Sequence, residues 1–321
     1  MSEIRLTSSR VSSPGASPLP ARLDDAVRGI LLVAIGYAII SCADAAVKWA
    51  LPQIGIAGAM LWRGVFGAVT VAVIARAGGT PFAALWPVNL RLVSTRSLLH
   101  CVVSCAFYAA WFLGMPLADS YAVAAVSPLI MTLLAIPLLG ETVGWRRWTS
   151  TLIGFSGVLV MLQPGGSLWR WETGVLLGAM VLLALTRLWT RVLARTDTPA
   201  TITFWLMVAH IPAGLVLMPA FPPPETLFPS GGIMLALAAL GCGNAMAHML
   251  FARAFAMAPV SVLAPFEYSP LIWGLPLGLL IWGDWPSNTT FAGAAIVIAA
   301  GLYNLYRERL RARLARQAAA L

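Results

Sequence analysis

The sequence predicts an all-α integral membrane protein with ten transmembrane helices, arranged as two inverted five-helix repeats. Three observations lead to this fold class. First, 60% of the 321 residues are hydrophobic and only 10% are charged, whereas about a quarter of the residues in a soluble domain are charged. Second, the apolar residues gather into ten long runs. Third, the two halves of the chain share landmarks at a fixed spacing.

Each of the ten runs is about as long as a membrane span, which needs about 20 apolar residues to cross a hydrocarbon layer of ~30 Å. We expect every run to be helical, because a segment surrounded by lipid has to satisfy its backbone hydrogen bonds internally. Together the runs leave no room for a second soluble domain. They cover residues 29–50, 54–76, 97–115, 119–139, 147–163, 172–193, 199–219, 231–253, 259–282 and 288–306.

Basic residues orient this predicted bundle. They are concentrated before the first run, in alternate loops and after the last run, and the positive-inside rule therefore places both termini in the cytoplasm. We assign the net charge of +9 to topology and not to nucleic-acid binding. The predicted organisation is a disordered cytoplasmic tail (1–28), a first repeat (29–166), a second repeat (167–306) and a basic cytoplasmic tail (307–321), in a multi-pass protein of the cytoplasmic (inner) membrane.

The internal repeat becomes visible when the chain is shifted along itself by 143 residues. Pro116 then meets Pro259, and Glu141 meets Asp284. Five spans are an odd number, so the second half enters the membrane in the opposite sense to the first. Inverted repeats are the architecture of many secondary transporters, whose substrate site lies between the two halves.

Prolines interrupt the fourth run and its repeat equivalent, the ninth. A proline removes a backbone donor and bends a helix, and corresponding interrupted spans in two halves point to a substrate site. Kinking for packing alone is the alternative. The candidate residues for hinges in broken helices are Pro128, Pro137, Pro265, Pro270 and Pro276.

Charged residues inside the runs are candidates for substrate contacts, because burying a charge in a membrane is expensive. Glu267 could hold a substrate amine or a coupling proton, or it could form a structural pair with His248 or an arginine. Arg63 could hold a substrate carboxylate, or it could pair with Asp44 or Glu267.

Other polar residues of the runs receive structural interpretations first. We expect Asp44 and Lys48 to form an ion pair along one helix. Arg187 is expected to extend toward a helix end, and His210 to form a hydrogen bond between helices. No spacing of His, Cys, Asp or Glu indicates a resident metal or another cofactor.

Aromatic side chains in the middle and late runs could form the walls of a cavity for a flat or apolar group. Tryptophan and tyrosine also populate membrane interfaces, so each residue taken alone has that alternative. The candidates are Tyr108, Trp111, Tyr121, Tyr268 and Trp273.

Two stretches, 107–166 and 250–303, resemble the EamA-like branch of the drug/metabolite transporter superfamily. Each has a small-residue turn, a proline within the next span, a Gly-Glu or Gly-Asp at the end of that span, and a Gly/Ala-rich closing span. The resemblance implies ten helices in two inverted repeats and transport of small organic metabolites. It also implies a cavity lined by spans three, four, eight and nine. The second half departs from the pattern, with Trp282-Gly283-Asp284 where the family has Leu-Gly-Glu.

These observations predict a secondary transporter, and not an enzyme, that works by alternating access. An amino acid or amino-acid-like solute is the first expectation for the substrate, with protons as a candidate coupling ion. The alternatives are a larger aromatic or nucleoside-bearing metabolite, such as a vitamin, a sulfonium nucleoside or a drug, and a membrane-embedded lipid-modifying enzyme. The chain could act in the bilayer as a monomer or a homodimer.

Overall fold

Helices account for nearly all of the chain that the computed structural model describes, which is residues 23–141, 143–163, 171–285 and 287–319. Most of the predicted tail 1–28 and the predicted repeat boundary near residue 166 lie outside these residues. The α-helices are α1 (Leu23–Ala77), α2 (Leu90–Phe112), α3 (Leu117–Ala124), α4 (Ser127–Leu139), α5 (Trp145–Leu162), α6 (Trp171–Leu193), α7 (Pro199–Leu217), α8 (Gly231–Met257), α9 (Val260–Leu263), α10 (Ser269–Trp282) and α11 (Asn288–Ala319). Two 3₁₀ helices, η1 (Phe82–Leu85) and η2 (Ala264–Tyr268), complete the elements.

Six helical stretches of the described chain are long and apolar enough to cross a membrane. Two shorter apolar helices, Trp148–Leu162 and Asn288–Ala300, lie in α5 and α11. The protein is therefore an all-helical, multi-pass membrane protein, and the count of ten spans and the inverted repeat stay predictions. The six stretches are Asp25–Ala77, Leu90–Phe112, Leu117–Leu139, Trp171–Leu193, Pro199–Leu217 and Gly231–Met257.

A kink at Gly55 divides α1 into two arms. Gly55 has φ 65°, a left-handed backbone conformation that favours glycine. A Cβ atom at this position would also meet Cδ of Pro224 at 2.9 Å. The chain therefore turns here without a loop, and its arms pack mainly against α8 and α7.

Two further interruptions occur where the sequence places prolines. The helix stops between α3 and α4 at residues 125–126, and Pro128 lies in the first turn of α4. In the second half, Pro265 lies in the first turn of the 3₁₀ segment η2 and Pro270 lies in the first turn of α10. Residues 125 and 268 at these breaks are 143 positions apart, which is the spacing of the sequence repeat. The helices continue through Pro137 and Pro276, so these two prolines do not lie at the breaks.

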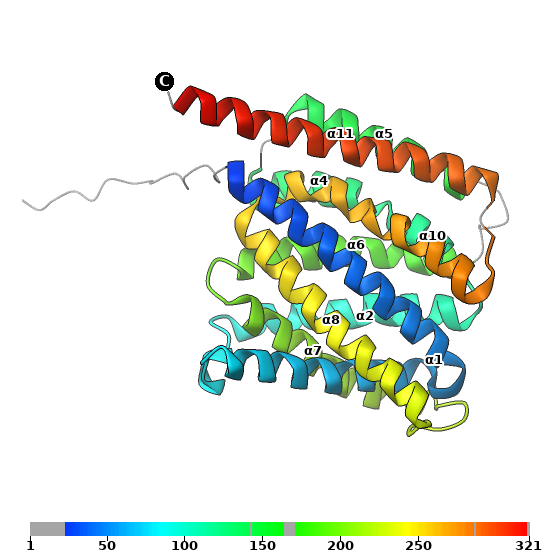
Figure 1. The fold of residues 1–321 in the computed structure, drawn as a ribbon. Helices are drawn as coiled ribbons and strands as arrows, with labels where there is room; N and C mark the ends of the chain where they lie inside the picture. The colour runs from blue at the N-terminus through cyan, green and yellow to red at the C-terminus, as the bar shows by residue number, and fades with distance from the viewer. Residues whose placement is uncertain (1–22, 142, 164–170, 286, 320–321) are drawn as a thin grey trace, which may run out of the picture.

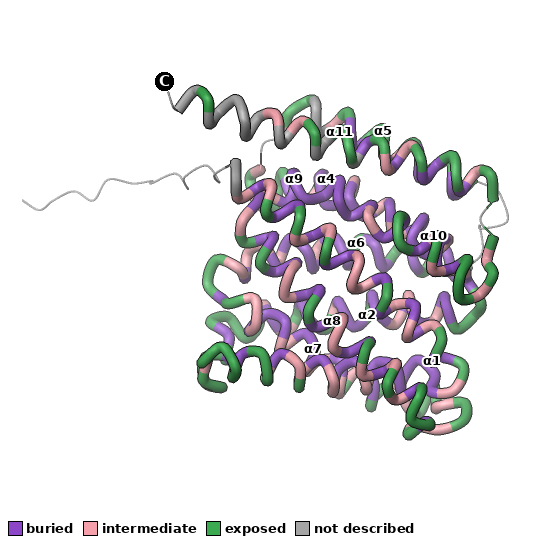
Figure 2. Tube along the Cα trace, viewed as in Figure 1, coloured by how far each residue is buried: buried purple, intermediate pink, exposed green. Residues whose placement is uncertain are grey.

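The helices stack in layers, with α5 and α11 side by side along one face (Figure 1). A Cβ atom on Gly157 of α5 would meet the backbone oxygen of Gly293 in α11 at 2.7 Å, so small residues permit this close approach. The first turn of α1 and the last turns of α11 lie at the same end of the bundle. Buried residues concentrate between the layers, while exposed residues mark the outer faces and the ends (Figure 2).

The last helix extends further than the sequence indicated. The segment 307–321 was predicted as a basic tail after the last span, and α11 continues through it as far as Ala319.

Candidate substrate-binding site

A buried cavity lies where α1, α2, α3, α6 and α8 meet the broken segment formed by η2 and α10. Its volume is about 80 Å³, well below the ~300 Å³ at which ligand pockets begin. The helices around it therefore have to separate before it can hold a metabolite. Four of its lining residues carry formal charges, and the polar and aromatic remainder includes Tyr37, His100, Ser104, Tyr108, Trp111, Tyr121, Asn244 and His248.

Arg63 enters the cavity from the second arm of α1, and neutral groups surround it. Its guanidinium donates to Oγ of Ser104 at 2.9 Å and to the hydroxyl of Tyr108 at 3.1 Å. A third contact joins the guanidinium nitrogen Nη2 to Nε2 of His248, at a distance of 3.3 Å. The Nε atom of Arg63 is buried and has no hydrogen-bond partner among the residues that the structure describes.

His210, which does not line the cavity, fixes the orientation of this network. Its Nδ1 lies 2.8 Å from the backbone oxygen of Leu206. A carbonyl only accepts, so Nδ1 carries the hydrogen and Nε2 of the neutral ring is the acceptor. The hydroxyl of Ser104, 3.1 Å away, therefore donates to Nε2. The lone pairs of Ser104 are left to accept from Arg63.

Glu267, in η2, belongs to an ion pair inside the protein. Its Oε1 lies 3.4 Å from Nε of Arg187 in α6, and the hydroxyl of Tyr37 in α1 donates to its other oxygen. Arg187 also donates to Tyr37 at 3.1 Å and lies over the ring of Phe251, 4.4 Å from its centre. This cluster ties the first span and α6 to the broken segment of the second half.

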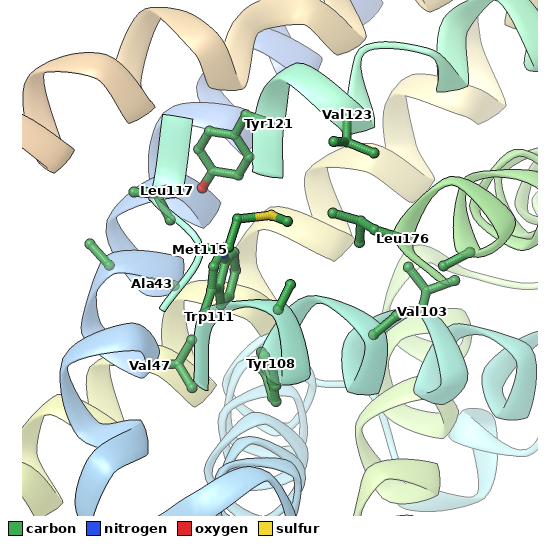
Figure 3. Packing of buried hydrophobic residues seen from close by; sticks show 14 of the residues in the cluster. Ala43, Val47, Val103, Tyr108, Trp111, Met115, Leu117, Tyr121, Val123 and Leu176 are labelled. Carbon is green, nitrogen blue, oxygen red and sulfur yellow. The ribbon is translucent and has the colours of Figure 1, made fainter. Parts of the chain in front are cut away.

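Asp44, on the first arm of α1, accepts a hydrogen bond from the hydroxyl of Tyr121 at 2.9 Å. Figure 3 shows Tyr121 on α3 with its hydroxyl directed toward α1, and Tyr108 and Trp111 together on α2. The indole of Trp111 donates to Oγ of Ser120 at 2.8 Å. The first bond ties α3 to α1 and the second ties α2 to α3, and together they hold the rings of Tyr121 and Trp111 beside the cavity.

The two ends of the bundle differ in their contacts. At one end, the carboxylate of Glu141 accepts hydrogen bonds from the backbone N–H groups of Val260 and Ser261, each at 2.9 Å, and Arg191 lies within electrostatic range of it. At the other end, Asp284 lies 3.4 Å from Nζ of Lys48.

A second cavity of about 430 Å³ opens beside Asp284. The start of α3, the end of α5 and the connection between α10 and α11 form its walls. Within the described chain, Asp284 makes no hydrogen bond to the backbone at the start of α3, although this position is the repeat equivalent of the start of α9. Among the described residues, a carboxylate thus joins the two halves of the chain at one end of the bundle, and a cavity lies at the other end, which we call the hollow end.

Most of the residues that the sequence singled out come together in the central cavity. Glu267, Arg63, His248, Tyr108, Trp111, Tyr121 and Pro270 all line it. Two predicted aromatic residues lie elsewhere. Tyr268 packs its ring against Gly154 of α5, and Trp273 is 41% exposed on the outer surface. Pro128, Pro137, Pro265 and Pro276 do not line the cavity.

Two sequence-based interpretations of charged residues are wrong, those of Lys48 and Arg187. For Glu267 the structure bears out the alternative of a pair with an arginine, Arg187. Lys48 pairs with Asp284 and not with Asp44. Arg63 pairs with neither Asp44 nor Glu267. Arg187 was expected to reach a helix end, but it is 3% exposed and pairs with Glu267. The i, i+4 spacing suggested the Asp44–Lys48 pair, and the position of Arg187 toward a helix end suggested its interpretation. The actual partners, Asp284 and Glu267, lie far away in the sequence.

The cavity also contains residues that the sequence did not suggest as site residues, among them Tyr37, Ser104 and Asn244. Asp44 and Arg187 are 143 residues apart, which is the spacing of the predicted repeat. This spacing could have indicated that both charged residues belong to the same site. In the part of the chain that the structure describes, no group of three His, Cys, Asp or Glu side chains is arranged to hold a metal ion.

A bundle of apolar helices around a buried cavity with charged walls is typical of membrane transport proteins. Comparison with known proteins agrees with this class. The riboflavin transporter of Rhizobium johnstonii is 30% identical over 229 residues, which cover 68% of this chain and 72% of that protein. The chain therefore belongs to the same family of transporters as this protein. No protein-family model matches the chain.

Other relatives and a solved structure extend the comparison. The S-adenosylmethionine uptake transporter of Rickettsia felis is 25% identical over 62% of this chain and 67% of its own. The pseudopaline exporter of Pseudomonas aeruginosa is 25% identical over 87% of this chain and 96% of its own. A known crystal structure shares the fold with a TM-score of 0.71 at 17% identity, covering 87% of this chain and 98% of its own. The relatives are transporters of small metabolites and not enzymes.

Proposed function

We propose that the protein is a secondary transporter that carries a small organic metabolite through the central cavity by alternating access. Ten spans form two inverted five-helix repeats in the cytoplasmic membrane, with both termini in the cytoplasm. One observation carries this proposal. The helix breaks at residues 125–126 and 268 occupy repeat-equivalent positions, and Tyr121 and Glu267, close to these breaks, line the same cavity. Corresponding broken helices mark the substrate sites of secondary transporters.

The difference between the two ends supports alternating access. The bonds from Glu141 to the start of α9 close one end, while the second cavity beside Asp284 is hollow. A substrate reaches the central site from the hollow end in this conformation. The opposite conformation releases Glu141 and closes the end at Asp284.

A ring-bearing metabolite is the substrate class that we favour. Two relatives are named for riboflavin and S-adenosylmethionine, which carry ring systems, and five Phe, Tyr and Trp side chains line the cavity. A free amino acid was the first expectation from the sequence, and the comparisons do not support it. It remains the second candidate, because Arg63 and carboxylates line the same cavity.

Uptake into proteoliposomes that contain the purified full-length chain tests the function. Labelled riboflavin, labelled S-adenosylmethionine and a mixture of labelled amino acids are offered with and without a pH gradient. We expect uptake of at least one ring-bearing compound, and dependence on the gradient will identify protons as the coupling ion. Uptake of amino acids alone will favour the second candidate.

Two tryptophan variants provide a matched control. Trp111→Leu removes a ring from the cavity, whereas Trp273→Leu removes one from the outer surface. Loss of about tenfold in uptake is expected from Trp111→Leu only, since stacking on one aromatic side chain is worth about 1–3 kcal/mol. Equal effects of both variants will contradict transport through this cavity.

A further inference from the structure

The four charged residues that line the cavity are not equally compensated. Glu267 and Arg187 neutralise each other at 3.4 Å, and Tyr37 bonds to both. Their charges are therefore already satisfied within the protein. The other two, Arg63 and Asp44, have no such partner.

Arg63 bonds to a serine, a tyrosine and a histidine, none of which carries a negative charge. Among the described residues, no carboxylate oxygen lies within 4.0 Å of its guanidinium nitrogens. Arg63 is also 4% exposed. A permanent positive charge is thus held at the cavity by neutral donors and acceptors alone.

Asp44 presents the complementary case. Its one described side-chain contact is the hydroxyl of Tyr121, and within the described chain no Lys, Arg or His nitrogen lies within 4.0 Å of its oxygens. Asp44 and Arg63 are in electrostatic range of each other across the cavity, yet they do not touch. The two opposite charges therefore face the cavity without forming an ion pair with each other.

Uncompensated charges at a buried site are expensive, and removing one partner of a buried pair is strongly destabilising. Intramembrane charges of this kind mark binding functions. We propose that the cavity binds its substrate as a zwitterion, with Arg63 contacting an anionic group and Asp44 contacting a cationic group. This inference rests on the proposed transport function and specifies its substrate class.

Aromatic side chains connect the two charge subsites. The hydroxyl of Tyr108 bonds to Arg63, and the hydroxyl of Tyr121 bonds to Asp44. Trp111 lies near both, with its ring centre 5.9 Å from that of Tyr108 and its indole bonded to Ser120 beside Tyr121. The substrate class is therefore a metabolite with a flat ring and both signs of charge, such as a nucleoside or aromatic ring joined to an amino-carboxylate.

This assignment moves the cation subsite away from Glu267. A substrate amine at Glu267 has to displace Arg187 from an existing ion pair, whereas an amine at Asp44 meets a carboxylate with no cation. Glu267 is a positioning residue that holds the broken segment against α6.

Calorimetric binding to the full-length protein in detergent tests the two subsites with three related probes. S-adenosylmethionine carries both signs of charge, its decarboxylated form lacks the carboxylate, and 5′-methylthioadenosine has neither charge. Riboflavin, a neutral ring compound, is the fourth probe. The variants are Asp44→Asn, Arg63→Gln and a control, Glu225→Gln, in the exposed loop before α8.

The proposal predicts that each substitution weakens binding only of those probes that carry the charge opposite to the residue removed. Asp44→Asn weakens binding of the first two probes about tenfold or more, as expected when a charged hydrogen bond is lost. Arg63→Gln weakens the first probe by a similar factor and leaves the decarboxylated probe unchanged. Binding of 5′-methylthioadenosine changes in neither variant, and the control binds all probes as the wild type does.

Other outcomes separate failure of this inference from failure of the proposed function. If riboflavin binds and is transported, and the three charged or nucleoside probes show no dependence on either substitution, the zwitterion assignment is overturned and the transport function stands. If folded wild-type protein binds none of the probes, the zwitterion assignment is overturned, and the transport function is overturned as well if the proteoliposomes take up none of the labelled compounds.

A second pair of variants keeps the test decisive if Asp44→Asn or Arg63→Gln does not fold. Tyr121→Phe and Tyr108→Phe each remove one hydroxyl next to a charge and keep the ring. Tyr121→Phe is expected to weaken only the probes with a cationic group, and Tyr108→Phe only the probe with the carboxylate. Equal losses for all probes in both variants overturn the assignment.

Discussion

The carboxylate of Glu141 accepts a hydrogen bond from the backbone N–H of Val260 at 2.9 Å and so joins the end of α4 to the start of α9. A second bond, from the N–H of Ser261, has the same length. Hydrogen bonds to a carboxylate are among the stronger ones in proteins. This contact connects the two halves of the chain at one end of the bundle.

Removing this carboxylate should open that end. In a protein without its native cysteines, Val260→Cys places a thiol at a fully buried position while keeping the N–H. Adding Glu141→Ala is expected to speed alkylation of this thiol about a hundredfold or more, because two hydrogen bonds worth about 1.5–3 kcal/mol each are lost. The rate of modification by a maleimide measures the effect.

Asp284→Ala is the matched control, because Asp284 is the repeat equivalent of Glu141 and lies at the hollow end. It should leave the reactivity of the thiol at 260 unchanged. An equal increase in both variants means that closure at this end does not depend on Glu141.

The kink in α1 requires glycine. Gly55→Ala is expected to lower stability by about 1–3 kcal/mol, because it forces a side chain into a left-handed conformation and into contact with Pro224. Thermal unfolding in detergent measures the loss. Gly178→Ala in α6 is the control, since a Cβ there meets no atom within 4 Å, and its midpoint should stay the same or rise. A Gly55→Ala protein as stable as the wild type contradicts the requirement.

The absence of a side chain at Gly274 leaves room for the ring of Tyr121 beside the cavity. A Cβ atom on Gly274 would meet Cε2 of Tyr121 at 2.7 Å, whereas one on Gly278 meets only Cβ of Asp284 at 3.8 Å. We therefore expect Gly274→Ala to raise the KM for uptake about tenfold, by an overpacking strain of about 1–3 kcal/mol at this ring. Gly278→Ala should leave KM within about twofold, because a Cβ atom there makes only an ordinary van der Waals contact and causes no overpacking. Equal values for both variants will show that the ring tolerates displacement.

His210 positions Arg63 through Ser104. His210→Leu removes the acceptor for the serine hydroxyl, which is then free to rotate so that its lone pairs no longer face Arg63. KM should rise by about fivefold from loss of roughly 1 kcal/mol of hydrogen bonding. His210→Gln keeps one donor and one acceptor and should recover most of the affinity. Kinetics of uptake measured for both variants test the orientation, and a glutamine variant no better than the leucine variant contradicts it.

The sequence was sufficient to predict a multi-pass helical bundle, since hydropathy depends on local composition, whereas the ten spans and the inverted repeat stay predictions. It anticipated helix breaks near Pro128 and Pro270 and the gathering of Arg63, Glu267 and His248. It could not distinguish Trp111, which faces the cavity, from Trp273, which faces outward, because both lie in apolar helices and only packing sets their direction. The sequence also did not predict which residues pair with the charged side chains. Asp44 and Lys48 are four residues apart, yet each finds its partner on an element more than 70 residues away.

The left-handed turn at Gly55 has a mechanical consequence. The two arms of α1 are joined directly at a single residue without a loop, and the segment Pro222–Pro224 lies against that residue. Asp44 is carried by one arm and Arg63 by the other. A tilt of either arm is therefore a rotation about Gly55. Such a rotation changes the distance between Asp44 and Arg63 and at the same time moves the helices that pack on that arm.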